Sequence, residues 1–370
     1  GAVSARDRGP AGGCPAAGCG GDVPASAAGV GRPVKIDVLL EPDQTPDQLT
    51  ELALLCEQAG VQTMWLQNYV ACRDAFMSLV PAALATRRVG LGVCVISPWE
   101  MHPVKMANSL LTLQEYSKGR ASLVIGGGGE WLARLAIEPV KRVRAVREAI
   151  ELVRGGCSGK PLTYQGELFK VYGYRPQFGA SATPPPVYAG ANQPQMLRAT
   201  VPVADGVMYS DMVRPLIART VGQTTDALAA KGRTAEGYRI NNIWAWHVKK
   251  DPAVARREAC REMLLRGLLE PWYLESFLSP EDCAVVAQKK QAFFQAYRDK
   301  SGVIRDVPEH IVDALIANFT FTGTPDQIER RLPELQAFAA AGVTELNFRL
   351  HDDPADAIRL IGEKVIPALK

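Results

Sequence analysis

A run of four glycines, Gly126, Gly127, Gly128 and Gly129, follows the apolar segment Ala121–Ile125. Glycine has no Cβ, so consecutive backbone N–H groups can point together at a phosphate or another anion. No Lys-Ser or Lys-Thr pair follows the run, which excludes a P-loop, and the continuation of a dinucleotide-binding fingerprint is also missing. A flexible connector is the alternative interpretation, because loops of every kind are rich in glycine.

Two side chains near these glycines could move a proton. Glu130 follows the run directly, and a carboxyl group beside an apolar pocket can act as an acid, although most glutamates are solvated. His102 precedes Pro103 at the expected start of a helix, where it could donate to a ring or a carbonyl, or merely cap the helix. His247 and His351 are weaker candidates, chosen by position alone.

Other chemistries find little support in the sequence. We recognise no Ser-His-Asp set, no Cys-His set and no spacing typical of metal ligands, which disfavours hydrolysis and metal chemistry and predicts no metal site. A pocket rich in glycine and aromatic groups but poor in acid–base groups is typical of an enzyme whose bound cofactor supplies the reactivity.

Eight apolar segments alternate with amphipathic helices, which predicts parallel βα units closed into a (β/α)8 barrel of the TIM type, with an open doubly wound sheet as the alternative. Strand-to-helix loops of such a barrel gather at one end, where the glycine run and Glu41 would lie. The expected strands are 34–40, 61–67, 89–96, 121–125, 186–189, 206–209, 239–248 and 344–350. The expected helices are 46–59, 74–86, 103–116, 139–154, 193–201, 213–230, 252–268, 325–341 and 354–366.

Residues 34–370 are expected to form one domain that carries two insertions. Residues 160–178 read as a hairpin after the helix at 139–154, and residues 270–319 read as a helical insertion before the last strand. In residues 1–33, 21 of the 33 residues are Gly, Ala or Pro, which predicts a disordered tail or an added extension.

Composition narrows the possible partners of the 370-residue chain. A net charge of +3 gives no case for nucleic acid or a membrane surface, and no apolar stretch is long enough to span a membrane. The basic residues Lys141, Arg142, Arg144 and Arg147 share one helix and are expected to form a solvated face. Eight cysteines without a CxxC pair favour reduced thiols and a cytoplasmic location.

With these segments in order, the chain resembles the bacterial luciferase-like family, and within it the F420-dependent branch that includes methylenetetrahydromethanopterin reductase and F420-dependent dehydrogenases. The resemblance covers about 34–370 and is thinnest through 270–319. Its motifs are Trp65–Tyr69 with Arg73-Asp74, Thr86–Pro98 with His102-Pro103, Ser117–Arg120, Arg147–Arg154 with Thr163–Phe169, Pro186–Ala191, Ala204–Val207, Gly323–Pro325 and Val365–Pro367.

The resemblance implies an oxidoreductase that transfers a hydride between coenzyme F420 and a small organic substrate at a C=C, C=N or C=O bond. It also implies a homodimer and a non-proline cis peptide at Cys94–Val95 behind the cofactor ring. The implied cofactor-binding residues are Asn68, Cys94, Val95, Ile96, Ser97, the four glycines 126–129, Gly190, Ala191, Asn192 and Tyr209. The implied catalytic residues are Glu130, His102, Tyr69 and Asn68.

One departure from the family pattern keeps two alternatives open. Relatives commonly have an acidic residue followed by histidine at the end of the second strand, where this chain has Asn68 and Tyr69. With an ordinary pKa near 10, a tyrosine is a poor acid–base group at neutral pH. The alternatives are an FMN-dependent monooxygenase of the same fold and a non-catalytic member that binds the cofactor.

Overall fold

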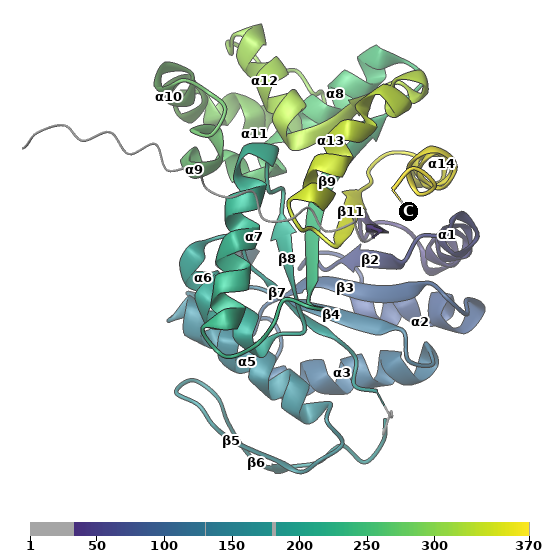
Figure 1. Cartoon of the computed structure of the whole chain (residues 1–370), viewed down its shortest axis with the longest axis vertical. Helices are drawn as coiled ribbons and strands as arrows, with labels where there is room; N and C mark the ends of the chain where they lie inside the picture. The colour runs from purple at the N-terminus through teal and green to yellow at the C-terminus, as the bar shows by residue number, and fades with distance from the viewer. Residues whose placement is uncertain (1–32, 130, 180–182, 370) are drawn as a thin grey trace, which may run out of the picture. The chain divides into compact units, whose positions relative to one another are not determined.

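The computed structural model describes residues 33–129, 131–179 and 183–369, so the glycine- and alanine-rich segment 1–32 and Glu130 lie outside the described residues. Within the described part, nine parallel strands form one sheet and two antiparallel strands form another (Figure 1). The parallel strands are β1 (Lys35–Leu40), β2 (Thr63–Gln67), β3 (Gly90–Ile96), β4 (Ala121–Ile125), β7 (Val187–Gly190), β8 (Gly206–Ser210), β9 (Arg239–Val248), β10 (Thr320–Gly323) and β11 (Glu345–Arg349).

Eight of these strands close into a ring. β1 pairs with β2 and β11, β11 pairs with β9, and β9 pairs with β8, so the order β1-β2-β3-β4-β7-β8-β9-β11 returns to β1. The predicted TIM-type barrel is therefore confirmed, and the open doubly wound sheet is wrong, because an open sheet would leave two of these strands unpaired at its edges.

Helices alternate with the strands and cover the outside of the barrel (Figure 1). The helices that follow strands of the nine-stranded sheet are α1 (Pro46–Ala59), α2 (Ala75–Ala85), α3 (Pro103–Tyr116), α4 (Trp131–Arg134), α5 (Arg142–Gly156), α6 (Pro194–Thr200), α7 (Arg214–Ala229), α8 (Pro252–Glu262), α13 (Ile328–Ala340) and α14 (Pro354–Leu360). None of the helices in the described ranges has the length and apolar character that crossing a membrane requires.

α1 illustrates how local sequence sets these boundaries. The Thr45 hydroxyl accepts a hydrogen bond from the Gln48 backbone N–H, and the Gln48 side chain accepts one from the Thr45 backbone N–H. Pro46 occupies the first helical position, where its missing N–H costs nothing, and Gly60 ends the helix with a φ of +82°. Each of these signals was visible in the sequence, and the helix lies where it was predicted.

Two helices begin or end away from the predicted position because of backbone conformation, and one strand was not predicted. The helix expected from 139 begins at Arg142, since Lys141 before it is left-handed (φ 47°, ψ 46°). The helix expected over 252–268 ends at Glu262 and gives way to the 3-10 turns η2 (Met263–Leu265) and η3 (Gly267–Leu269), where Gly267 and Leu268 have positive φ. The strand β10 was not predicted; it pairs with the upper half of the long β9.

The two departures from a plain barrel are a hairpin and a group of short helices. β5 (Leu162–Gln165) and β6 (Lys170–Tyr174) form the antiparallel hairpin, which extends from the bottom of Figure 1. The short helices gather at the opposite end of that view. They are α9 (Pro271–Leu274), α10 (Pro280–Gln288), α11 (Lys290–Arg298) and α12 (Glu309–Phe319).

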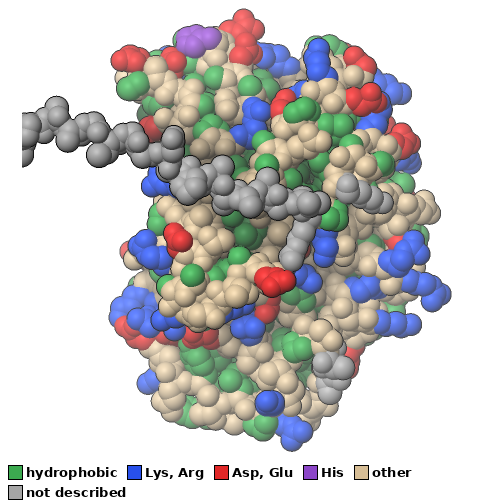
Figure 2. All heavy atoms as spheres, viewed as in Figure 1, with side chains coloured by type: hydrophobic (Ala, Val, Ile, Leu, Met, Phe, Trp, Pro, Cys, Tyr) green, Lys and Arg blue, Asp and Glu red, His purple; other side chains and the backbone are tan. Residues whose placement is uncertain are grey.

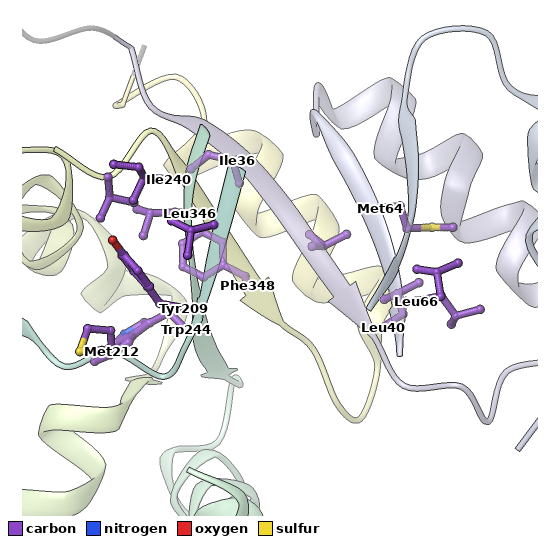
Figure 3. Packing of buried hydrophobic residues seen from close by; sticks show 14 of the residues in the cluster. Ile36, Leu40, Met64, Leu66, Tyr209, Met212, Ile240, Trp244, Leu346 and Phe348 are labelled. Atoms are coloured by element: carbon purple, nitrogen blue, oxygen red, sulfur yellow. The ribbon is translucent and has the colours of Figure 1, made fainter. Parts of the chain in front are cut away.

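Apolar side chains fill both the barrel interior and the layer between strands and helices. Figure 3 shows part of the outer layer, which includes Tyr209, Met212 and Trp244. A separate buried cluster takes one residue from each of seven barrel strands: Leu39, Trp65, Cys94, Val124, Tyr188, Met208 and Ile243. A Cβ on Gly92 would lie 2.1 Å from the Trp65 ring, so Trp65 fills the space that a side chain at position 92 would occupy.

The interior also buries an acidic residue near the N-terminal end of β1. Asp37 is fully buried, and its Oδ2 accepts hydrogen bonds from Trp65 Nε1 and Asn241 Nδ2, each at 2.9 Å. Asp37 Oδ1 has no partner among the described residues. Burial, and then the neighbouring Glu345 carboxylate, raise the pKa of Asp37 well above its ordinary value. An ionised Asp37 is therefore costly in the folded chain.

Replacing Asp37 with Asn should stabilise the protein at alkaline pH. A raised folded-state pKa means that folding takes up a proton above the ordinary carboxyl pKa, so the free energy of unfolding falls as pH rises through that window. Asp37→Asn keeps a neutral acceptor and should gain about 1–3 kcal/mol at pH near 8, with the gain shrinking towards pH near 4. Denaturant unfolding at a series of pH values measures this gain in the free energy of unfolding.

The matched control is Asp47→Asn, the same substitution on an exposed residue in the first turn of α1. There the carboxylate favours the helix, so the control should lose a few tenths of a kcal/mol at alkaline pH. A pH-independent difference between Asp37→Asn and the parent chain would contradict the assignment.

Candidate functional site

All eight barrel strands are parallel, so their carboxyl ends meet at one rim of the barrel. Glu41 follows β1, Gln67 ends β2, and Arg349 ends β11. The glycine segment follows β4, and Gly190 ends β7. The residues that sequence analysis selected from separate loops are thus attached to the same end of the barrel.

The rim is irregular at the end of β3. The Cys94–Val95 peptide bond is cis, at the position that the family resemblance implied, and the pairing of β3 with β4 shifts register between Val93 and Ile96. Asn68 donates its backbone N–H to the Cys94 carbonyl at 3.0 Å, which ties the end of β2 to this bulge. The Val95 side chain is 40% exposed, so an apolar group projects from the rim here.

Gly126 after β4 and Gly190 at the end of β7 leave little room for a side chain beside this bulge. A Cβ on Gly126 would lie 2.5 Å from Val95 Cγ2, and a Cβ on Gly190 would lie 3.6 Å from the Gly126 Cα. Gly126 donates its N–H to the Ile96 carbonyl at 3.0 Å, and Gly128 adopts a φ of +68°. The segment is therefore a defined part of the rim in which side chains would collide, rather than a loose connector.

A buried hydroxyl lies next to these glycines. Ser97 is 1% exposed, and its Oγ has no hydrogen-bond partner among the described residues. Its Cβ lies 3.3 Å from where a Cβ on Gly128 would stand. Because an unpaired buried hydroxyl is costly, it is available to a bound group. The glycine segment and Ser97 together fit the phosphate and side chain of a flavin-like cofactor.

Tyr69 belongs to a polar network on the opposite arc of the rim. Its hydroxyl accepts a hydrogen bond from Arg349 Nη2 and donates one to Gln67 Oε1, both at 2.6 Å. Glu41 Oε1 accepts from Gln67 Nε2 at 2.8 Å and from Arg349 Nε at 3.0 Å. Burial raises the pKa of Tyr69, so its hydroxyl stays protonated at neutral pH. With its proton kept, the Tyr69 hydroxyl can hold both hydrogen bonds, one accepted from Arg349 and one donated to Gln67.

Two buried histidines lie beside this network. The rings of His247 and His351 stack with centroids 5.2 Å apart and planes 6° apart. His351 Nδ1 lies 3.3 Å from Glu41 Oε1, whereas His247 Nδ1 lies 3.6 Å from Glu258 Oε2, beyond hydrogen-bond distance. Burial lowers the pKa of both imidazoles, so both are neutral, and Lys249, 3.2 Å from Glu258, balances that carboxylate.

The helical insertion is fastened to the same rim. Arg266, fully buried just before it, forms an ion pair of 3.0 Å with the buried Asp211 at the end of β8. Tyr273 of α9 donates its hydroxyl to the Ser210 carbonyl and accepts from Asn192 Nδ2. The insertion therefore starts as a rigid continuation of the rim between β7 and β8.

Three of the selected side chains do not face the barrel mouth. Tyr209 as a cofactor-binding side chain is wrong: it is fully buried and its hydroxyl lies 2.7 Å from Thr224 Oγ1 on α7, so it points outward (Figure 3). The Ile96 side chain also packs into the outer core, and only its carbonyl reaches the glycine segment. Asn192 Nδ2 and Oδ1 both bond to the Ser210 backbone, so this side chain fixes a loop.

The other residues selected from the sequence lie in the barrel interior, in the outer core or at a helix start. Cys94 faces the interior, where its Sγ lies 3.5 Å from Met208 Sδ, and burial raises its pKa to about 12. Ala191 is buried in the outer core. His102 caps α3, its Nδ1 accepting from the Val104 N–H at 3.2 Å, and its ring meets Phe169 of the hairpin edge-on. His102 thus caps the helix, which was the structural alternative for this residue. The cap uses only Nδ1, so Nε2 is not part of it.

Arg349 and Arg266 are the rim residues that sequence reasoning missed. The last strand alternates polar and apolar residues, Glu345-Leu346-Asn347-Phe348-Arg349, and this alternation indicates that Arg349 faces the interior. Arg266 carries no comparable signal, since it follows a helix whose end was misplaced. Among the described residues, no group of His, Cys, Asp and Glu side chains could hold a metal ion.

The geometry defines a (β/α)8 barrel with a bulged third strand and a glycine-lined rim. Residues 28–345 match the family model described as luciferase-like monooxygenase, and the chain belongs to this bacterial luciferase-like family. It is 30% identical over 345 residues to the 5,10-methylenetetrahydromethanopterin reductase of Archaeoglobus fulgidus, covering 91% of this chain and 100% of that protein.

Many solved structures share the fold, and two of them are F420-dependent enzymes. The coenzyme F420-dependent tetrahydromethanopterin reductase of Methanopyrus kandleri superposes with a TM-score of 0.80 at 22% identity, covering 92% of this chain and 100% of that chain. An F420-dependent secondary alcohol dehydrogenase in complex with an F420-acetone adduct superposes with a TM-score of 0.72 at 17% identity, with the same coverage.

Removing the Tyr69 hydroxyl tests its assignment as a fixed, protonated group. Tyr69→Phe should lower the free energy of unfolding by about 1–3 kcal/mol, because the buried Arg349 loses a hydrogen bond. Urea unfolding measures the loss, and Tyr172→Phe, at an exposed tyrosine of the hairpin, should change nothing. Should Tyr69→Phe remove a titration between about pH 6 and pH 9 in any binding or rate profile, the hydroxyl ionises and the assignment is wrong.

Proposed function

We propose that this protein is an F420-dependent oxidoreductase that transfers a hydride between the deazaflavin and a small organic substrate. The observation that carries the proposal is the rim segment formed by Val95, Gly126 and Gly190, with the buried Ser97 hydroxyl beside it. A Cβ on Gly126 would collide with the Val95 side chain at 2.5 Å, and a Cβ on Gly190 would lie 3.3 Å from Val124 Cγ1. The likeness to F420-dependent reductases and dehydrogenases supports the choice of cofactor.

In this proposal Val95 supports one face of the cofactor ring, and the backbone N–H groups of Gly127 to Gly129 face its phosphate. The N–H groups of Gly126 and Ala191 are donated to the Ile96 and Met208 carbonyls, so these two residues line the site through their other atoms. When bound, F420 supplies a ring carbon that gives up or accepts a hydride at a C=C, C=N or C=O bond. Asn68 and Tyr69 orient the ring or the substrate, since Arg349 and Gln67 hold the Tyr69 hydroxyl in place. A cytoplasmic location and homodimerisation stay predictions from the family resemblance.

Glu130 and His102 are proposed to handle the proton that accompanies the hydride. Glu130 is chosen because it directly follows the glycine segment in the sequence. His102 has only Nε2 for this role, because Nδ1 accepts the helix-capping hydrogen bond. A neutral His102 with Nδ1 as acceptor carries its proton on Nε2.

Cofactor selectivity can be measured directly. In a fluorescence titration of the full chain, F420 should bind with a Kd of about 1 µM or tighter, and FMN should bind much more weakly. A preference for FMN, with oxygen consumption in the presence of reduced flavin, would favour the monooxygenase after which the family is described. Tight F420 binding without turnover across a broad acceptor panel would favour a non-catalytic carrier, which the engaged Tyr69 hydroxyl also fits.

The two proton-handling candidates can be separated by substitution. Glu130→Gln should lower turnover of reduced F420 on the order of 10²-fold while sparing cofactor affinity, because Gln keeps the shape and cannot donate an acidic proton. Glu281→Gln, at an exposed glutamate of α10, is the control. His102→Asn retains a good capping acceptor, so full activity in this variant would limit His102 to capping. An unchanged rate for Glu130→Gln would remove Glu130 from the mechanism.

A further inference from the structure

A pocket of about 540 Å³ lies between the start of α5, the start of α6 and the hairpin. Its polar lining consists of Lys141, Arg142, Arg144, Arg147, Glu167 and Gln195. Four of these side chains are basic and one is acidic. In Figure 2, Lys and Arg side chains gather at the left edge of the molecule, at the height of α5 in Figure 1.

The positive charge of this pocket is only partly balanced. Glu167 is in contact with Lys141 and lies 3.5 Å from Arg144 Nε, so one carboxylate serves two cations. Arg147 is paired with Glu151 at 3.0 Å. Arg142 has no ion-pair or hydrogen-bond partner among the described residues. The pocket therefore carries surplus positive charge, on side chains that are exposed or half-buried, in agreement with the expected solvated helix face.

The placement of these cations is unfavourable for α5 itself. The N-terminus of a helix carries partial positive charge, so cations in its first turn destabilise it. α5 begins with Lys141, Arg142 and Arg144, has no acidic residue in its first turn, and lacks a side-chain cap. An anion bound between these residues would stabilise the start of α5, because it would interact favourably with both the basic side chains and the positive end of the helix dipole.

The pocket is contiguous with the glycine segment of the rim. Arg142 Cδ lies 2.9 Å, and Met196 Cε of α6 lies 3.6 Å, from where a Cβ on Gly127 would stand. Gly127 follows Gly126, which in turn meets Val95 at the bulge. A ligand whose ring rests against Val95 and whose side chain follows the glycines would therefore reach Arg142 next.

We propose that this pocket binds the anionic tail of the deazaflavin cofactor. Coenzyme F420 extends from its ribityl chain through a phosphodiester to a chain of glutamates, so its tail presents several carboxylates in series. The cationic groups of Arg142, Arg144 and Lys141 would pair with these carboxylates. The aliphatic part of the Arg142 side chain also packs against Gly127. The inference rests on the proposed function, since it requires a deazaflavin at the rim.

The experiment compares F420 with its precursor, which has the same ring and ribityl chain but no phosphodiester or glutamates. Fluorescence titrations of the full chain give the Kd of each from about 0.05 M to about 0.5 M salt. F420 should bind more tightly than the precursor, and its advantage should shrink as salt rises. The double variant Arg142→Gln/Arg144→Gln should weaken F420 binding on the order of tenfold and leave the precursor unchanged.

A matched control and an independent readout accompany the titrations. Arg219→Gln removes an exposed arginine of α7, outside the pocket lining, and should leave both affinities unchanged. Without ligand, the double variant should melt at a temperature no lower than that of the parent chain, because cations are removed from the start of a helix. An unaltered melting temperature also shows that the variant is folded.

The outcomes separate this inference from the proposed function. If neither compound binds, the proposed function fails. If both bind equally at all salt concentrations, the deazaflavin assignment stands and the tail site is overturned. If the double variant weakens both compounds alike, the arginines act by shaping the glycine segment, which also overturns the tail site. If it raises only the KM of an anionic substrate, the pocket belongs to the substrate and the inference is wrong.

Discussion

Closure of the barrel by β9 is the constraint on which the rest of the structure depends. This ten-residue strand pairs with β8 and β11 through its lower half and with β10 through its upper half. Because the strands of this closed ring are all parallel, every strand-to-helix loop emerges at one rim. Groups as distant in sequence as Glu41 and Arg349, 308 residues apart, are thereby brought to 3.0 Å.

The two arcs of the rim differ in electrostatic character. The arc of β3, β4 and β7 is built from backbone, glycine and small apolar groups, with one unpaired hydroxyl at Ser97. The arc of β1, β2 and β11 is built from charged groups that already satisfy one another, such as Arg349 with Glu41 and Tyr69. A planar, uncharged ring suits the first arc, because the second would require its own ion pairs to be broken.

Local sequence predicted the elements well and the orientation of their side chains less well. The cap of α1 and the barrel strands follow from short-range signals such as Thr45, Pro46 and Gly60. Tyr209 was assigned to the wrong face because β8 is buried on both faces, so apolar residues occupy inward and outward positions alike and the two-residue period is hidden. In β11 the inward positions are polar, and there the period is readable.

The helical insertion is joined to the barrel at both of its ends, by the Arg266–Asp211 pair at its start and by the pairing of β10 with β9 at its exit. The helices between these anchors can therefore diverge in length and composition without altering the strands beneath them. The barrel can therefore be retained through descent while the segment between the anchors is exchanged or rewritten. Chimaeras that exchange the segment between Arg266 and Thr320, and keep Asp211 and β10 from the parent barrel, would preserve both anchors.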